Sequence, residues 1–475
     1  MSYLFTYSTL EWLIRVVMTL VVIRRRLPAQ TALAWLAVIF FIPVVGVVLY
    51  LLVGDNRLGR RRITTYRRID AITRTARRLA AIDAHQARPD VGDAQQPMIR
   101  LAERISGNPI VGGNQVELLS DNNLVPRLVR DIDAAQHHVH LLTYIYRPDD
   151  TGRAVGEALR RAAKRGVQCR LLVDQVGSRP FLAGRYDDGL RADGVAVHSA
   201  LPVAPIRRRL ARIDLRNHRK LAVIDGRVGY AGSQNIVDAN YGHKRAGAWI
   251  DLSGRFVGPV VHQLQLTFLS DWAFDANEQL GSPDLFPDLE PVGEVTAQAV
   301  PTGPTGDRET FRRVLLAALS SARRRIVLTT PYLIPDEATL LALEMAADRG
   351  VQVQIVVPAL CDHPLVAAAG RSYYTRLLDA DVEIYQFHPG MLHAKTITVD
   401  DAFGLLGSAN MDIRSFDLNF ELAVLLYGPQ VTSTLRFAQQ RYLSDSAPLA
   451  RDAWAARPRW RSYLEDAAAL FSPLL

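Results

Sequence analysis

The chain has 475 residues, of which 49% are hydrophobic and 22% are charged. This composition excludes an intrinsically disordered protein, and the length allows two or three domains with large buried cores. The chain carries 56 basic and 48 acidic residues, a net charge of +8, which favours contact with the phosphates of lipids or nucleic acids. The two cysteines, Cys169 and Cys361, lie far apart, which argues against a disulfide framework and fits a reducing compartment.

Residues 1–55 predict a transmembrane helical hairpin. Residues 31–53 contain no charged side chain, and a run of this length is sufficient to cross a bilayer as a helix. Trp35 and Tyr50 lie near the two ends of the run, where aromatic side chains are enriched at membrane interfaces. The alternative interpretation is a buried helix of a soluble protein, which is rarely apolar over such a length.

A shorter apolar run, residues 1–23, supplies the other half of the predicted hairpin. Glu11 and Arg15 interrupt it, but they lie one helical turn apart and are expected to form an ion pair. Residues 56–112 are predicted to be a basic juxtamembrane linker, because residues 57–78 contain nine arginines and a single acid. Such a cluster is expected to stay in the cytoplasm beside anionic lipids. We therefore predict a multi-pass protein of the bacterial inner membrane with a cytoplasmic catalytic part.

From about residue 113 the pattern becomes that of an α/β protein. Residues 139–146 predict a strand, residues 152–164 a helix and residues 167–173 a second strand. These strands are apolar enough to be buried on both faces.

The later half of the chain repeats this order. Residues 158–174 align without gaps with residues 342–358, and both segments run from a helix through an Arg-Gly turn into an apolar strand. The repeat predicts two similar lobes, residues 113–278 and 306–475. Residues 279–305, rich in proline, glycine and acidic residues, predict a linker between them.

A polar motif occurs once in each lobe. The first copy contains His218, Lys220 and Asp225, followed by Ser233 and Asn235 in a Gly-Ser-Gln-Asn sequence. The second copy has the same internal spacing and consists of His393, Lys395, Asp400, Ser408 and Asn410. A lysine supplies positive charge for a phosphate, an asparagine supplies a hydrogen-bond donor, and an imidazole attacks phosphorus or protonates the leaving oxygen.

Two other interpretations of the motif are ordinary buried histidines and a zinc site. No Cys or Glu lies at ligand spacing near either histidine, so no metal is expected. The lobes also differ, because the first has twelve extra residues before its histidine, including Arg207–Arg209 and Arg212. This basic loop is expected either to bind a phosphate or membrane surface or to be a solvated loop.

These features resemble the bacterial cardiolipin synthases of the phospholipase D superfamily, over nearly the whole chain. The paired His-Lys motifs are specific to the superfamily, and the hairpin with the Arg-Ser-Phe and Asn-Phe-Glu blocks is typical of the synthases. The matching segments are 49–54, 214–220, 330–332, 407–416, 419–421 and 472–475. The chain departs from the family at Leu333 and at Ala380–Asp381, outside the motifs.

The resemblance implies an α/β fold in which two duplicated phospholipase D-like lobes form one shared active site behind the transmembrane hairpin. It also implies phosphatidyl transfer from one phosphatidylglycerol to another, which releases glycerol and forms cardiolipin through a phosphohistidine, without a cofactor. The implied partners are these lipids and the anionic membrane surface, and no nucleic acid is expected.

The resemblance further implies roles for individual residues. His218 is the implied nucleophile and His393 the acid and base. Acidic residues of the opposite lobe are implied to support each imidazole, so we expect Asp251 beside His393 and Glu421 beside His218. The implied catalytic set is His218, Lys220, Asp225, His393, Lys395 and Asp400, and the implied phosphate-binding set is Asn235, Asn410, Ser233 and Ser408. Within the catalytic set, the two aspartates suit capping of turns at strand ends better than proton transfer.

Three other functions are compatible with the sequence. A phospholipase D would replace the acceptor lipid with water, and an anchored phosphodiesterase would cleave nucleic acid. An inactive lipid or nucleic-acid binder is disfavoured because both motifs are intact.

Overall fold

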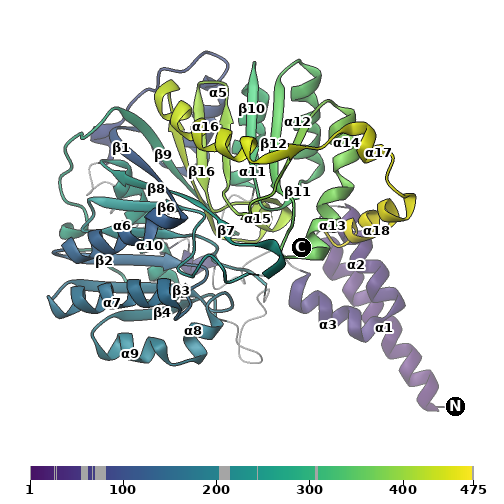
Figure 1. Ribbon diagram of the computed structural model, residues 1–475. Coiled ribbons are helices and arrows are strands. Elements are labelled where there is room, and N and C mark those ends of the chain that lie inside the picture. The colour runs from purple at the N-terminus through teal and green to yellow at the C-terminus, as the bar shows by residue number, and fades with distance from the viewer. Residues whose placement is uncertain are drawn as a thin grey trace. The chain divides into compact units, whose positions relative to one another are not determined.

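The computed structural model describes residues 2–25, 27, 29–54, 63–66, 68–69, 82–202, 214–242, 244–304 and 309–472. The chain divides into two compact units (Figure 1). The smaller unit contains the first three helices, and the larger one contains most of the first predicted lobe and all of the second. Most of the arginine run 57–78, and Arg207–Arg209 and Arg212 of the predicted basic loop, lie outside the described residues.

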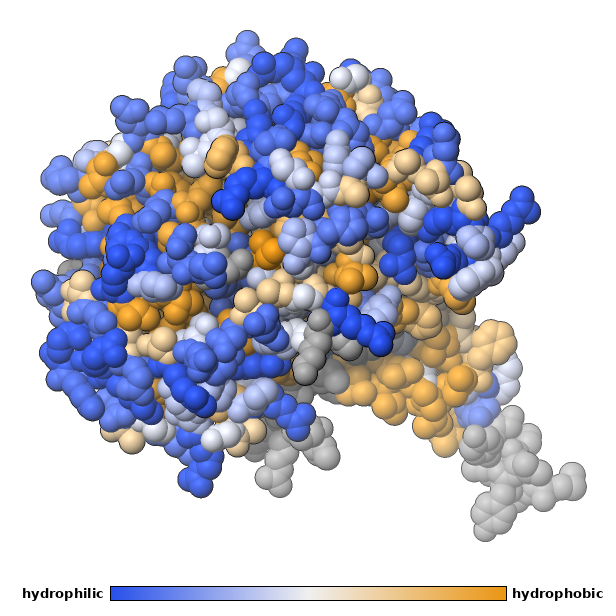
Figure 2. All heavy atoms as spheres, in the orientation of Figure 1, coloured by the Kyte–Doolittle hydropathy of each residue, from blue (hydrophilic) through white to orange (hydrophobic). Residues whose placement is uncertain are grey.

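The smaller unit contains α1 (Ser2–Arg24), α2 (Ala29–Phe41) and α3 (Pro43–Val53). The predicted ion pair is confirmed, because Arg15 Nη2 lies 3.2 Å from Glu11 Oε2. Many apolar side chains of these helices are exposed, and their described surface is largely hydrophobic (Figure 2). Within the described residues, no helix is both long and apolar enough to span a membrane.

The uncharged run 31–53 is not one continuous helix. Ile42 leaves helical geometry with φ −135° and ψ 74°, and Pro43 starts α3, since proline cannot continue the hydrogen-bond ladder of α2. The rings of Trp35 and Tyr50 meet edge to face with centroids 5.4 Å apart. The expectation that these two rings occupy opposite membrane interfaces is therefore wrong.

The larger unit is built on one sheet of 15 strands, in which the two lobes repeat each other in mirror order. From one edge to the other the order is β19-β13-β12-β10-β15-β16-β18-β9-β1-β8-β6-β5-β2-β3-β4. The strands of the first lobe are β1 (Val111–Ser120), β2 (His138–Thr143), β3 (Gln168–Asp174), β4 (Ala196–Ala200), β5 (Leu221–Ile224), β6 (Val228–Gly232) and β8 (Leu252–Val257). Those of the second lobe are β9 (Val295–Thr302), β10 (Arg325–Thr329), β12 (Gln352–Pro358), β13 (Glu383–Phe387), β15 (Thr396–Val399), β16 (Phe403–Gly407), β18 (Glu421–Tyr427) and β19 (Ser446–Pro448).

The two halves join where β1 pairs antiparallel with β9, with Val111 opposite Ala297. This seam contradicts part of the predicted linker 279–305, because Val295–Thr302 is a central strand that also pairs with β18. Its Val and Ala residues alternate only weakly within a segment rich in proline, glycine and acids, so the local pattern did not predict a strand. The partners that make it one lie far away in the sequence.

Helices cover both faces of the sheet. One face of the first lobe is covered by α6 (Asp121–Ala134) and α7 (Asp150–Lys164), which share an apolar core with its strands. On the opposite face, α10 (Val260–Asp275) packs against strands of both lobes and is buried along most of its length. In the second lobe, α16 (Pro429–Ser444) packs against one face of the sheet.

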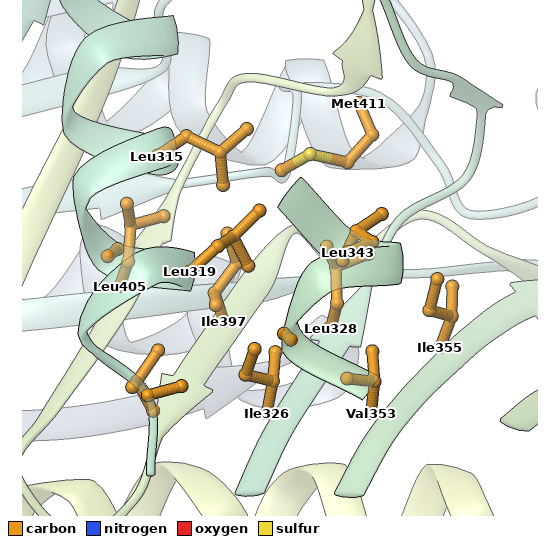
Figure 3. Packing of buried hydrophobic residues seen from close by; sticks show 14 of the residues in the cluster. Leu315, Leu319, Ile326, Leu328, Leu343, Val353, Ile355, Ile397, Leu405 and Met411 are labelled. Carbon is orange, nitrogen blue, oxygen red and sulfur yellow. The ribbon is translucent and has the colours of Figure 1, made fainter. Parts of the chain in front are cut away.

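The core of the second lobe lies under α11 (Thr310–Ser321) and α12 (Glu337–Asp348). Leu315 and Leu319 of α11 and Leu343 of α12 point onto strand residues such as Ile326 and Ile355 (Figure 3). Residues of α5 (Gln96–Ser106) join the same core. Part of the predicted basic linker 56–112 is therefore a folded component of the second lobe.

The remaining elements of the larger unit are short or peripheral. They are α8 (Arg179–Ala183), α9 (Tyr186–Ala192), α13 (Pro364–Ser372), α14 (Tyr374–Asp379), α15 (Ile413–Asp417), α17 (Arg451–Ala455) and α18 (Arg459–Ala469). Two small sheets pair β11 (Leu333–Ile334) with β17 (Met411–Asp412), and β7 (Trp249–Ile250) with β14 (Met391–Leu392).

The predicted repeat of helix, turn and strand is confirmed. Asp149 caps the start of α7 by accepting a bond from Gly152 N, and Asp336 caps α12 through Thr339 N. After each helix a glycine with positive φ turns the chain into the next strand, Gly166 at 89° and Gly350 at 81°. A glycine adopts this left-handed conformation without a steric penalty.

Two leucines of α12 should contribute very differently to stability, because only one of them, Leu343, belongs to the core shown in Figure 3. Leu343 is fully buried, whereas Leu341 is 47% exposed. Leu343→Ala should lower the free energy of unfolding by about 2–5 kcal/mol through the lost contacts and the cavity left behind. The matched control Leu341→Ala should change it by about 0.5 kcal/mol or less. Urea unfolding followed by near-UV circular dichroism measures both, and equal effects would contradict the described packing.

Candidate active site

Both motif histidines are held by hydrogen bonds that cross between the lobes. His218 Nδ1 lies 3.0 Å from both carboxylate oxygens of Glu421, and His393 Nδ1 lies 2.6 Å from Asp251 Oδ1. These are the two contacts that the family resemblance implies. In each pair Nδ1–H donates to the carboxylate, so the other ring nitrogen, Nε2, is left to react.

The main chain fixes these pairs. His218 N donates to Phe420 O at 2.9 Å, and His393 N donates to Ile250 O at 2.8 Å. In both cases the accepting residue immediately precedes the acid that holds the imidazole. The motif lies just outside a strand in each lobe, because β5 and β15 begin directly after the lysines. The His-x-Lys segments instead run along the opposite lobe.

The two lysines are buried beside their own histidines. Lys220 Nζ donates to His218 O at 2.7 Å, and Lys395 Nζ donates to His393 O at 2.6 Å. An ammonium group has three donors, so two remain on each lysine for a phosphate. Burial lowers the pKa of Lys220 to about 8 and that of Lys395 well below its usual value, although the nearby carboxylates oppose the shift.

Burial also keeps both imidazoles neutral. It lowers the pKa of His218 to about 4 and that of His393 to about 3, against the carboxylates that raise both values. Burial opposes ionisation of Asp251, but the contact with His393 holds its pKa at about 2. The pKa of Glu421 is likewise lowered by His218 and Lys220 despite burial. The site therefore holds two ionised carboxylates and two neutral imidazoles, whose similar pKa values do not rank the histidines.

Both histidines line one cavity of about 510 Å³. Asn235 and Asn410, two of the predicted phosphate ligands, also line it. Asn235 Oδ1 accepts a hydrogen bond from Ile145 N at 3.1 Å. The oxygen of this amide therefore faces the main chain, and its Nδ2 group is the donor. Asn410 Nδ2 donates to Asp412 Oδ2 at 3.0 Å, so the two asparagines are not equivalent.

The structure places the two predicted serines elsewhere. Ser233 Oγ donates to Asp251 and Ser408 Oγ donates to Glu421, both at 2.5 Å. Each hydroxyl has a single proton, which is used in this bond. The serines therefore orient the acids that hold the histidines, and the prediction that they bind phosphate directly is wrong.

Asp225 and Asp400 are also absent from the cavity wall of described residues. Asp225 accepts bonds from the main-chain N–H groups of residues 136–138, each at 2.8 Å. Asp400 does the same for residues 323–325, at 2.8–3.0 Å. Both have positive φ, 53° and 49°. They cap turns, as the sequence suggested, and their inclusion in the catalytic set is corrected.

Several residues of the cavity were not predicted. The ring of Tyr144 lies 4.9 Å from that of His218, and the ring of Trp249 lies 4.4 Å from that of His393. The other unpredicted polar or aromatic lining residues are Arg147, Arg216, Tyr241, Tyr332, Asp362, His363, Asp412, Arg414 and Asn419. Some lie within a few residues of the motifs, but only the fold shows which of them reach the cavity.

Among the described residues, no three His, Cys, Asp or Glu side chains are grouped so that they could hold a metal ion. Imidazoles can act as nucleophiles and as acids and bases at a phosphorus atom, and amide groups such as those of Asn235 and Asn410 can donate hydrogen bonds to its oxygens.

Two family models match parts of the chain. A model of the family described as "Cardiolipin synthase, PLD-like domain" matches residues 128–272 and 315–441, and one described as "Phospholipase_D-nuclease N-terminal" matches residues 13–54. The crystal structure of phosphatidylserine synthase from Haemophilus influenzae covers 80% of this chain and 100% of its own, with a TM-score of 0.61 and 15% identity. The fold is thus that of the phospholipase D-like proteins.

Relatives in Yersinia narrow the assignment. Proteins named cardiolipin synthase A from Yersinia pseudotuberculosis and Yersinia pestis are 37% identical over 473 residues, 98% of this chain and 97% of theirs. The chain belongs to the cardiolipin synthase family of phospholipase D-like proteins.

The crossed pairs predict that an acid of one lobe controls the histidine of the other. Asp251→Asn should lower turnover by roughly 10²–10⁴-fold, because an amide neither orients the His393 tautomer nor stabilises its charged form. Asp225→Ala is the control, and it should lose about 2 kcal/mol or more of stability with its turn. The folded fraction of the control should keep its turnover number. Steady-state kinetics and thermal unfolding separate the two effects, and a similar loss of turnover in both variants would contradict the assignment.

Proposed function

We propose that this enzyme synthesises cardiolipin by transferring a phosphatidyl group from one phosphatidylglycerol to another. The observation that carries the proposal is the pair of histidines, held by crossed acids, that line a single cavity. One displacement at phosphorus needs an attacking group and a proton donor, and each lobe supplies one imidazole. The cardiolipin synthase relatives support the choice of substrate.

In the first step His218 Nε2 attacks phosphorus and the bond to the glycerol oxygen breaks. His393, which takes up a proton on Nε2 when the anionic phosphodiester binds, gives that proton to the glycerol oxygen, and glycerol leaves. In the second step His393 takes the proton of a hydroxyl group on another phosphatidylglycerol. That oxygen attacks phosphorus, the bond to His218 breaks, and cardiolipin is formed. The choice of His218 as the nucleophile rests on the family resemblance.

The cavity is suited to anionic lipids because its wall carries Arg147, Arg216 and Arg414. Arginines bind phosphate through several donors at once. Asp362, which accepts a hydrogen bond from Tyr332 Oη at 2.9 Å, is an acceptor that suits the hydroxyl groups of a glycerol headgroup.

We further propose that the enzyme acts at the inner membrane of a bacterium, with the larger unit on the cytoplasmic side. The apolar helices α1–α3, the match of residues 13–54 to the N-terminal family and the arginine run 57–78 support this location. Extraction of the membranes with alkaline carbonate and reporter fusions at the C-terminus test attachment and sidedness.

Incubation of the full chain with phosphatidylglycerol labelled in its headgroup and acyl chains tests the function. The expected products are labelled cardiolipin and free glycerol in equal amounts, formed in the presence or absence of EDTA. Phosphatidic acid in place of cardiolipin would identify a hydrolase instead. Loss of turnover in EDTA, restored by a divalent cation, would contradict the proposed phosphate site.

A second experiment assigns the histidines. With a nitrophenyl phosphodiester of the lipid, whose leaving group needs no proton, His393→Ala should accumulate a covalent phosphatidyl label, because the base that activates the acceptor is missing. His218→Ala should not be labelled. Mapping of an acid-labile, base-stable label by mass spectrometry decides the matter, and a label on His393 would reverse the roles.

The lowered pKa of Lys220 predicts how anion binding depends on pH. The lysine is charged below about pH 8 and neutral above it, so affinity for a phosphodiester should fall about tenfold per pH unit above this value. Dimethyl phosphate keeps one negative charge throughout this range, which makes its inhibition constant the appropriate measurement. Lys220→Met should bind it more weakly than the wild type below about pH 8 and lose this dependence. An inhibition constant that stays flat up to pH 10 would contradict the role of the lysine.

A further inference from the structure

The last helix of the chain exposes an apolar face to solvent. Trp460, Tyr463, Leu464, Leu470 and Phe471, in or directly after α18, are 58, 73, 60, 80 and 51% exposed. Within the helix, positions 460, 463 and 464 lie on one face, and Leu470 and Phe471 follow directly after its last residue. A soluble surface seldom carries large apolar side chains in a continuous stripe, and such a stripe marks a contact site for another protein or a membrane.

The opposite face of α18 is fixed to the larger unit. Glu465 forms ion pairs with Arg371 of α13 and with Arg457, at 2.9 and 3.0 Å. Ala468 is buried against Ile334 and Ala369. The helix is therefore held firmly at the edge of the larger unit, beside α13 (Figure 1), with its apolar stripe facing away from the fold.

The helix to which α18 is attached, α13, also contributes to the catalytic cavity. Val366 of α13 lines the cavity and also packs against the apolar cluster that contains Ala468. Leu365 of α13 is 46% exposed, and Leu360, which precedes this helix, is 61% exposed. The helix α13 therefore contacts α18 and also contributes to the wall of the cavity. Exposed apolar side chains occur on α13 and on α18.

The positive charges at the start of α18 indicate which kind of partner this face binds. Arg459 and Arg461 are exposed beside Trp460. Arginine next to Trp, Tyr, Leu and Phe on one amphipathic helix is the composition of helices that lie in the interface of an anionic bilayer. Tyr and Trp are suited to this location because each has an apolar ring with a polar tip.

We propose that the exposed face of α18 docks the larger unit onto the anionic lipid surface from which the cavity takes its lipids. The inference rests on the proposed function, because it assigns the surface that presents lipid to that site. The aromatic and leucine side chains enter the interfacial layer, the two arginines contact lipid phosphates, and α13 lies between this contact and the cavity.

Fluorescence of Trp460 tests the contact in the full chain, reconstituted into vesicles of phosphatidylglycerol and phosphatidylethanolamine. The spectrum of Trp460 is the difference between the wild type and Trp460→Phe. Brominated lipids should quench this difference spectrum and its emission should lie to the blue of a water-exposed indole. A difference spectrum that is red and unquenched would overturn the proposal. So would a blue spectrum that is unquenched by brominated lipids and depends on protein concentration, since it would show that a second copy of the chain covers the stripe.

Activity provides a second test with a matched control. Leu464→Gln combined with Phe471→Gln should lower turnover of long-chain phosphatidylglycerol in vesicles about tenfold or more, and leave turnover of the monomeric dihexanoyl lipid unchanged. The control is Phe437→Gln on α16, where the phenylalanine is 71% exposed, and it should change neither rate. Equal rates on vesicles for the double variant and the wild type would overturn the docking role, as would an equal loss on both substrates. Failure of the proposed function is distinguished from both outcomes, because the wild type would then form no cardiolipin from either lipid.

Discussion

The crossed bonds between the histidines and the carboxylates are the constraint on which the larger unit depends. Asp251 and Glu421 are 4 and 0% exposed, and a buried carboxylate without a partner costs several kcal/mol. Each acid accepts a hydrogen bond from a serine of its own lobe, but its imidazole partner lies on the other lobe. These pairs form only when the lobes pack together. The packing of the lobes therefore fixes the register of the His-x-Lys segments and, with it, the position of the reactive nitrogen atoms. The main-chain bonds of His218 to Phe420 and of His393 to Ile250 bring each imidazole next to its acid.

The scaffold is duplicated, but the side chains around the two histidines are not. Arg219 between the first histidine and lysine is buried, and it donates to Asp271, to Glu421 O at 3.0 Å and to Thr302 O at 2.8 Å. The corresponding residue in the second lobe is Ala394. A tyrosine lies beside one imidazole and a tryptophan beside the other. Two histidines in identical surroundings would have identical chemistry. The different roles of nucleophile and acid must therefore come from these differences in the neighbouring side chains.

Much of the fold could be predicted because the chain repeats its own signals. The paired motifs and the Arg-Gly turns before apolar strands depend on local sequence, and they indicated two α/β lobes with one site. The partners of single hydroxyl groups could not be predicted in the same way. Ser233 and Ser408 follow a glycine, in a position that suits phosphate binding, but each is within reach of a buried acid whose demand for a donor is stronger.

The errors in the predicted boundaries have a similar origin. Residues 295–302 form a strand because β1 and β18 offer main-chain partners on both sides, which no local pattern in that segment reveals. In the N-terminal run, uniform hydrophobicity concealed the effect of Pro43, which ends one helix and starts another. Local composition predicts well which segments are buried. Where a helix ends, or whether a segment becomes a strand, depends on individual residues and on partners far away in the sequence.

Charge balance links substrate binding to the chemistry. When Lys220 and Lys395 are protonated, their two charges balance those of Asp251 and Glu421, and the imidazoles stay neutral because burial lowers their pKa values. A phosphodiester adds one negative charge to this buried group. That charge raises the pKa of a neighbouring imidazole, so the proton needed by the leaving oxygen is taken up as the substrate enters. Burial makes a charge on the lysines costly, but it also strengthens their attraction to a phosphate, because the local dielectric constant is low. The acid is thus generated by the substrate on which it acts.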